Sequence, residues 1–283
     1  MVRKSQSNSS PTKNNTLNIF GPAGWILLGI LSVTFLVYSN IFSAPFIFDD
    51  RSNITGNPDI RSLSNLKTRL FHTDKNLAFR NDPSRPVVYL TFALNYSADG
   101  LDPAGYHWVN LALHMATVVL IFLLAFRLTG FGQFERETHR LFFAAVAAAF
   151  FALHPVQTEA VTYTSHRSDS LSALFYFAAL LFFINSIEDE SKPVWPAGFC
   201  FVIALFSKQI AATLPATALI VDYLFVSKGN KGGLKRHWKQ HLTLWAILVA
   251  YLLFRRFYIG QIGDPGFGTE KTWTHLNYAW TQT

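Results

Sequence analysis

Two adjacent carboxylates, Asp49 and Asp50, follow a long uncharged stretch that runs from Leu17 to Phe48. A stretch of this length and composition is typical of a membrane-crossing helix, so the pair is expected where the chain leaves the bilayer. A carboxylate in that place can act as a general base and remove a proton from an attacking hydroxyl group. The pair is therefore the first candidate for catalysis, although adjacent acids can also simply mark the boundary with water.

Further ionisable side chains fall in connections that are expected to lie on the same side of the membrane. The connection between the third and fourth predicted spans is unusually polar, and Pro155 prevents the preceding helix from continuing through it. Ionisable groups so close to a bilayer are costly, which makes them candidates for function. The candidates after the acidic pair are His154, Glu159, Arg167, Asp169, Lys208, Arg255 and Arg256.

Carboxylates and cations together suit one kind of reaction at a membrane surface. A hydroxyl group that attacks the anomeric carbon of a sugar on a lipid phosphate needs a base, and the departing phosphate needs positive charge. An aspartate can supply the base. The groups suited to hold the phosphate are Lys208, Arg167, Arg255 and Arg256, and arginine can bind it through two parallel hydrogen bonds. The Arg255–Arg256 pair lies on the side with fewer basic residues, which indicates either this role or an error in the last predicted span.

The composition indicates which elements must position these residues. Hydrophobic residues make up 50% of the chain, charged residues make up 14%, and the mean hydropathy is +0.22. This apolar content exceeds that of ordinary soluble domains. We therefore expect an all-α integral membrane protein with about seven transmembrane helices. The predicted spans are 24–42, 107–126, 141–157, 170–187, 193–207, 210–227 and 240–257, of which the fifth and seventh are near the lower length limit.

The spans divide the chain into three parts. We expect a disordered cytoplasmic tail at 1–23, a membrane domain at 24–259 and an external tail at 260–283, whose end without a stop pattern predicts a longer protein. The apolar run of the first span is too long for a signal peptide, so it is interpreted as an uncleaved anchor. Lysine and arginine are concentrated on the side of the N-terminal tail, which places that tail in the cytoplasm.

The long first external loop, residues 43–106, contains two apolar patterns. The spacing of Ile60, Leu63, Leu66 and Leu70 predicts an amphipathic helix on the membrane surface. The segment Pro86–Ala93 is too short to cross the bilayer and is expected to re-enter it or to pack on the helices.

Several residues that resemble ligands or binding groups have simpler explanations. His107, Asn110 and His114 share a helix face, but the two histidines are too far apart along the helix to hold one ion, so a polar seam between helices is favoured. No pair of residues has the spacing of a metal site, and no metal is assigned; a divalent cation is left unassigned and no cofactor is required. Asp222 is expected at the cytoplasmic border, paired or solvated. The basic stretch 228–239 indicates contact with anionic lipid and not with nucleic acid.

An ordered set of motifs resembles a known family. The motifs are Phe46-Ile-Phe-Asp-Asp50, Arg85-Pro-Val-Val-Tyr-Leu-Thr-Phe-Ala-Leu-Asn95, Gly105-Tyr-His-Trp-Val-Asn110 with His114, His154-Pro-Val-Gln-Thr-Glu-Ala160, Arg167-Ser-Asp169 and Ser207-Lys208. Together, over about residues 24–255, they resemble the membrane portion of the transmembrane, tetratricopeptide-repeat O-mannosyltransferase-like proteins of the GT-C superfamily. No motif is specific on its own; the order of the set carries the resemblance.

The resemblance implies an activity and roles for the residues. It implies inverting transfer of a sugar, a hexose such as mannose, from a polyprenyl-phosphate donor to a hydroxyl group of a protein, lipid or glycan on the non-cytoplasmic side. It implies that Asp49 is the base and that Asp50 assists it or binds the acceptor or a cation. It also implies that Lys208, Arg167 and Asp169 line the cavity for the donor phosphate. The sequence stops at Thr283, before the remaining helices and repeats of such proteins.

Two other classes of function remain as alternatives. A transporter or flippase of a lipid-linked substrate would be expected to carry ionisable or unwound positions near the middle of several spans. A non-catalytic membrane scaffold would need none of the charged groups. The expected location is a bacterial cytoplasmic membrane, with the endoplasmic reticulum membrane as the alternative.

Overall fold

The computed structural model describes residues 21–65, 84–132, 134 and 136–259. Within these ranges the chain forms helices and no strand. The longer helices are α1 (Pro22–Tyr38), α3 (Pro86–Asp99), α4 (Pro103–Thr129), α5 (Glu137–Leu153), α7 (Arg167–Glu188), α8 (Trp195–Leu205), α9 (Leu214–Val221) and α11 (Trp238–Phe254). The short segments between them are η1 (Ser39–Ser43), η2 (Arg51–Thr55), η3 (Asp59–Arg61), α6 (Gln157–Thr162), η4 (Thr164–His166), η5 (Gln209–Thr213), η6 (Asp222–Val226), α10 (Lys231–Arg236) and η7 (Arg255–Ile259).

Proline and capping residues set where several helices begin and end. Pro103 occupies the first turn of α4, where no backbone donor is needed, and the carboxylate of Asp102 accepts a hydrogen bond from the N–H of Ala104 at 3.1 Å. Helix α5 ends at Leu153 because Pro155 cannot continue it. The polar connection from His154 to His166 therefore does not continue α5, as the sequence predicts, and folds as the short segments α6 and η4.

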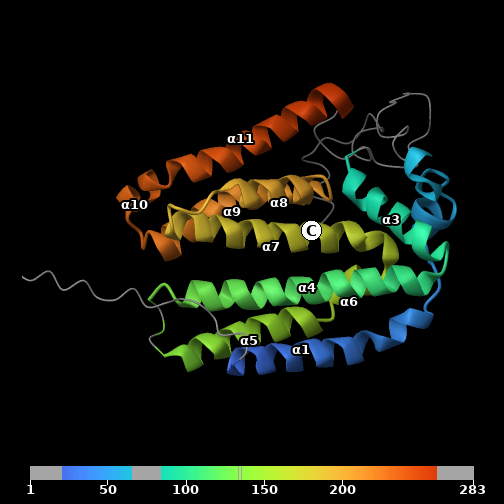
Figure 1. Ribbon diagram of the computed structural model, residues 1–283, viewed down its shortest axis with the longest axis horizontal. Helices are drawn as coiled ribbons and strands as arrows, with labels where there is room; N and C mark the ends of the chain where they lie inside the picture. Colours follow the sequence, from blue (N-terminus) through green and yellow to red (C-terminus); the bar gives the residue numbers. More distant parts are fainter. Residues whose placement is uncertain (1–20, 66–83, 133, 135, 260–283) are drawn as a thin grey trace, which may run out of the picture.

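Helices α1, α4, α5, α7 and α8 run along nearly one direction and form a bundle, while α11 is inclined to them and α3 lies obliquely (Figure 1). Helix α4 packs against α5 and α7, α7 packs against α8, and α1 packs against α4 and α5. Helix α3 and the segments η2 and η3 lie at one end of the bundle, and α10 lies at the opposite end (Figure 1). The two ends of the bundle therefore present different sets of connections.

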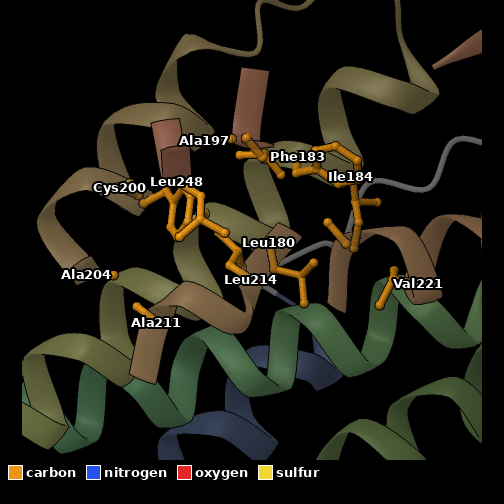
Figure 2. Packing of buried hydrophobic residues seen from close by; sticks show 14 of the residues in the cluster. Leu180, Phe183, Ile184, Ala197, Cys200, Ala204, Ala211, Leu214, Val221 and Leu248 are labelled. Carbon is orange, nitrogen blue, oxygen red and sulfur yellow. The ribbon is translucent and has the colours of Figure 1, made fainter. Parts of the chain in front are cut away.

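The largest core cluster joins α7, α8, α9 and α11, where Phe183, Phe201, Leu214 and Leu244 are fully buried. Figure 2 shows how side chains of α7, among them Phe183, gather with side chains of the neighbouring helices. Because lipid tails are as apolar as these side chains, their stabilising effect within a bilayer comes from close packing and not from removal from water.

A second cluster joins α1, α4 and α5 through small residues. Ala144, Ala148 and Ala152 recur every four residues along α5, are fully buried, and pack with Val118 and Phe122 of α4. Small side chains at this spacing lie on one face and allow two backbones to approach closely. The sequence of α5 therefore favours a tight pair with α4.

Every predicted span corresponds to helical structure with similar limits. Within the described ranges, four helices are long and apolar enough to cross a membrane, namely Pro22–Ser43, Pro103–Thr129, Thr164–Glu188 and Gln209–Val226. Helices α5 and α11 have 17 residues each and α8 has 11 residues, so they are shorter. The all-α membrane fold is confirmed, and the number of seven crossings stays a prediction.

The first loop packs onto the end of the bundle. Ile54 and Ile60 are fully buried in a cluster with Phe92 of α3 and Tyr106 of α4, and α3 contacts α4 and α7, as predicted for the short apolar segment. Ile60 thus faces protein, whereas the surface helix was expected to bury it in lipid. The rest of that predicted helix, at Leu66 and Leu70, lies outside the described residues, as do most of the N-terminal tail and the external tail 260–283.

Candidate active site

The acidic pair divides into one buried and one exposed carboxylate. Asp50 is buried, and its Oδ1 accepts a hydrogen bond from the N–H of Ser165 at 2.7 Å while its Oδ2 accepts one from the N–H of Ile47 at 3.1 Å. Asp49 is exposed, and its carboxylate has no hydrogen bond or ion pair with any described residue. Asp50 therefore ties the first loop to the connection before α7, and Asp49 is the member of the pair that can reach a substrate.

Glu159 and His166 of that connection, Asp169 in the first turn of α7 and Lys208 form a contiguous cluster. The Nδ1 atom of His166 lies 3.4 Å from Oε1 of Glu159 and 3.8 Å from Oδ2 of Asp169. The Nζ atom of Lys208 lies 2.5 Å from Oδ1 of Asp169. Glu159 is 67% exposed, whereas the side chains of Asp169 and Lys208 are 35% and 29% exposed. In the described part of the chain no three such acidic, histidine or cysteine side chains are arranged to hold a metal ion.

A cavity of about 360 Å³ opens beside Asp169. Its walls come from α4, α5, α6, α7 and η5, and they carry mostly apolar and hydroxyl side chains. The lining residues are His114, Thr117, Phe151, Gln157, Ala160, Asp169, Ser170, Ser172, Ala173, Tyr176, Phe177, Ile210 and Thr213. A cavity of this size, mostly apolar with a few polar groups, is typical of a site for a small organic group.

Arg167 is fully buried and bonded within the protein. Its Nε donates to Oδ1 of Asn110 at 2.7 Å, its Nη1 donates to Oδ1 of Asn95 at 2.6 Å, and its Nη2 donates to the carbonyl oxygen of Tyr106 at 3.0 Å. The guanidinium also lies over the ring of Phe92. Since each of its nitrogen atoms donates to a protein group, these contacts favour a structural role, and binding of a phosphate by Arg167 would require a rearrangement.

The remaining predicted site residues lie at the edges of the cluster. His154 accepts a hydrogen bond from the N–H of Val156 at 3.2 Å, which makes it part of the turn that follows α5. Arg255 is buried and its Nη1 donates to the hydroxyl group of Tyr251 at 3.2 Å, whereas Arg256 is exposed. The ring of Tyr251 contacts Phe206, so the end of α11 lies near the turn that carries Lys208.

Sequence reasoning missed Tyr163, whose hydroxyl oxygen accepts a hydrogen bond from the backbone N–H of Asp49 at 2.8 Å. A tyrosine in a polar connection carries no sequence signal for such a role. The polar seam on α4 was predicted, and His107 and His114 are buried there with hydrogen bonds to the carbonyl oxygens of Ala44 and Ala152.

The sequence is similar to a family of membrane mannosyltransferases and to several of its members. A model of the family described as dolichyl-phosphate-mannose-protein mannosyltransferase matches residues 86–255. The chain is 29% identical to the human protein O-mannosyl-transferase TMTC4, over 74% of this chain and 30% of that protein. It is 33% identical to the mouse protein O-mannosyl-transferase TMTC3, over 71% of this chain and 21% of that protein, and 37% identical to the Drosophila melanogaster protein O-mannosyl-transferase Tmtc1, over 60% and 19%.

These matches cover only part of each relative and only part of the candidate site. The chain spans less than a third of the length of these relatives, and no solved structure matches it significantly. The segment 86–255 includes Asp169, Lys208 and all the residues that line the cavity, but it excludes Asp49 and Asp50.

Proposed function

Since the chain belongs to the dolichyl-phosphate-mannose-protein mannosyltransferase family, we propose that it carries the site where mannose passes from a polyprenyl phosphate to a hydroxyl acceptor. One observation carries the proposal: a chain of contacts joins Asp49 of the first loop, the connection before α7 and Lys208 after α8 to Asp169, which lines the cavity. The backbone N–H of Asp49 donates a hydrogen bond to the hydroxyl group of Tyr163, whose ring lies 4.6 Å from that of His166. His166 in turn lies next to Asp169, which contacts Lys208.

Asp49 is the proposed general base. Its carboxylate takes the proton of the acceptor hydroxyl group, whose oxygen attacks the anomeric carbon from the side opposite the phosphate. The new bond from the acceptor oxygen to the sugar forms as the bond from the anomeric carbon to the phosphate oxygen breaks. The phosphate leaves with the electron pair, and the configuration at the anomeric carbon is inverted.

Lys208 is the proposed partner of the leaving phosphate. A fixed positive charge close to the departing oxygen stabilises the negative charge that develops there. The cavity between α4 and α7 would receive the sugar or the first part of the lipid chain, because its lining combines hydroxyl groups, the carboxylate of Asp169 and apolar side chains. Arg255 and Arg256 lie near the turn that carries Lys208 and are proposed as further contacts for the phosphate.

The placement of the charged groups favours a transferase over a transporter. Asp169 lies in the first turn of α7, and Lys208 lies directly after α8, so both stand at helix ends and not at helix centres. We place this end of the bundle on the non-cytoplasmic side and take a protein hydroxyl group as the acceptor, with lipid or glycan as the alternative. A bacterial cytoplasmic membrane and the endoplasmic reticulum membrane both stay as predictions for the location.

The Asp49→Asn variant tests the proposal. In vesicles supplied with a polyprenyl-phosphate mannose donor and a serine- and threonine-rich peptide, this variant should lose mannose transfer by at least about a hundredfold, as expected for the loss of a general base. Asp102→Asn is the matched control, since Asp102 is also exposed and asparagine can cap α4 equally well. Transfer by Asp49→Asn at the rate of the control would remove Asp49 as the base.

A further inference from the structure

The backbone next to Asp49 adopts a conformation that its sequence does not favour. Phe48 has a φ of 42°, in the left-handed region where a side chain as large as phenylalanine is rarely found. The ring of Phe48 is 81% exposed, so burial of the ring does not compensate for this conformation. Strained backbone of this kind persists only where the surrounding contacts enforce it, and it is frequent beside functional groups.

Contacts from the connection before α7 enforce this conformation. The hydroxyl oxygen of Tyr163 accepts the hydrogen bond of the Asp49 N–H at 2.8 Å, across 114 residues of sequence. Asp50, the next residue, is also held in place, because its carboxylate accepts hydrogen bonds from the N–H groups of Ser165 and Ile47. The backbone of Asp49 is thus fixed on both sides, while its carboxylate stays without a partner among the described residues.

Tyr163 is itself held in place by its neighbours, so it can position the backbone of Asp49. Its backbone N–H donates to the carbonyl oxygen of Glu159 at 3.1 Å, at the end of α6, and its carbonyl oxygen accepts the N–H of His166 at 3.1 Å. Its ring contacts the rings of Phe48 and His166, at 6.5 Å and 4.6 Å between ring centres. These contacts on both sides fix the ring, so its hydroxyl group has a defined position relative to Asp49.

We propose that Tyr163 is a positioning residue for the reaction, because its hydroxyl group fixes the backbone of Asp49 and thereby aims the carboxylate at the acceptor. This inference rests on the proposed role of Asp49 as the base. A base must lie within hydrogen-bond distance of the proton that it removes. Loss of the Tyr163 hydroxyl group leaves the Asp49 N–H without its partner and lets the strained turn at Phe48 relax.

The Tyr163→Phe variant tests the proposal. We expect kcat to fall about ten- to a hundredfold, since a misplacement of about 1 Å can cost that much, and we expect the KM for the donor to stay within about twofold. Tyr106→Phe is the matched control, because it also removes one hydrogen bond between a tyrosine hydroxyl group and the backbone at this end of the bundle, here one that the hydroxyl donates to the carbonyl oxygen of Gly100 at 3.0 Å. The control should keep its kcat, and both variants should keep the melting temperature of the parent in detergent.

A comparison with Asp49→Asn separates the positioning role of Tyr163 from the role of Asp49 as the base. If Asp49→Asn is inactive while Tyr163→Phe keeps the kcat of the control, the positioning role is refuted and the general base stands. If Asp49→Asn keeps its activity, the base is refuted, and the positioning role is refuted with it. A fall in kcat for Tyr163→Phe that comes with an equal fall for Tyr106→Phe would also overturn the inference, since it would indicate a general effect of losing such bonds.

Discussion

The ammonium group of Lys208 lies 2.5 Å from the carboxylate of Asp169, a residue that lines the cavity. Both side chains are partly exposed, so water or a ligand can reach the pair. A phosphate that binds Lys208 must therefore compete with a carboxylate that is already in contact with it. Because of this competition, loss of the Lys208 charge should weaken donor binding, and loss of the Asp169 charge should strengthen it.

The Lys208→Gln variant should lower kcat/KM for the polyprenyl-phosphate donor by about a hundredfold or more, because the leaving phosphate loses the positive charge proposed to stabilise it. The control is Lys192→Gln, which removes an exposed lysine whose Nζ lies 3.6 Å from Asp189, away from the cavity. Initial rates at several donor concentrations give both constants. Equal constants for the two variants would show that Lys208 does not contact the phosphate.

The Asp169→Asn variant should lower the KM for the donor several-fold, because Lys208 then loses its competing anion while asparagine keeps the shape of the side chain. Glu159→Gln offers a comparison, since it removes a carboxylate that is 67% exposed and should change the KM little. A rise in the KM for Asp169→Asn would instead mean that Asp169 holds Lys208 in the position in which it binds phosphate.

Much of the fold could be predicted from the sequence because its signals are local. The uncharged runs set the positions of the long helices, and Pro155 fixes the end of α5. The short apolar segment that begins at Pro86 packs on the bundle as α3, because it is too short to cross a bilayer. The orientation of Ile60 could not be predicted in this way, since it depends on the tertiary contact with α3.

The site could be predicted less well because its decisive contacts join distant residues. Asp49 and Asp50 look equivalent in the sequence, and what separates them is a hydrogen bond from Ser165 to Asp50 across 115 residues. Arg167 resembles a phosphate ligand by its charge, yet Asn95 and Asn110, which bind its side chain, lie 72 and 57 residues away. Residue type indicates which groups can react, and only the packing indicates which of them are free.

The Arg167→Met variant should reduce stability more than it reduces donor affinity. It leaves the side-chain oxygens of Asn95 and Asn110 without their donors inside the bundle, which costs about 1–3 kcal/mol for each unsatisfied group. Thermal unfolding in detergent should show a melting temperature lower by several degrees. If the melting temperature is unchanged and the KM for the donor rises, Arg167 binds the phosphate directly, as the sequence resemblance implies.

A buried carboxylate at the opposite end of the bundle should matter for stability alone. Asp222 is fully buried at the end of α9, and its Oδ2 lies 2.9 Å from Nδ1 of His237 and 2.8 Å from Nε2 of His241 at the start of α11. The hydroxyl group of Ser227 donates to its Oδ1 at 2.7 Å. The sequence predicted a paired or solvated aspartate here, and the structure shows a paired one that links two helices.

The Asp222→Ala variant removes the acceptor for these side chains and should destabilise the protein by about 2–4 kcal/mol, since buried donors are left unsatisfied. Asp189→Asn is the control, because Asp189 is 46% exposed and forms an ion pair with Lys192, and the loss of such an exposed pair should change stability little. Transfer activity per folded molecule should be the same in both variants, because the proposed site lies at the other end of α7. Loss of activity in Asp222→Ala at unchanged melting temperature would instead give this cluster a part in the reaction.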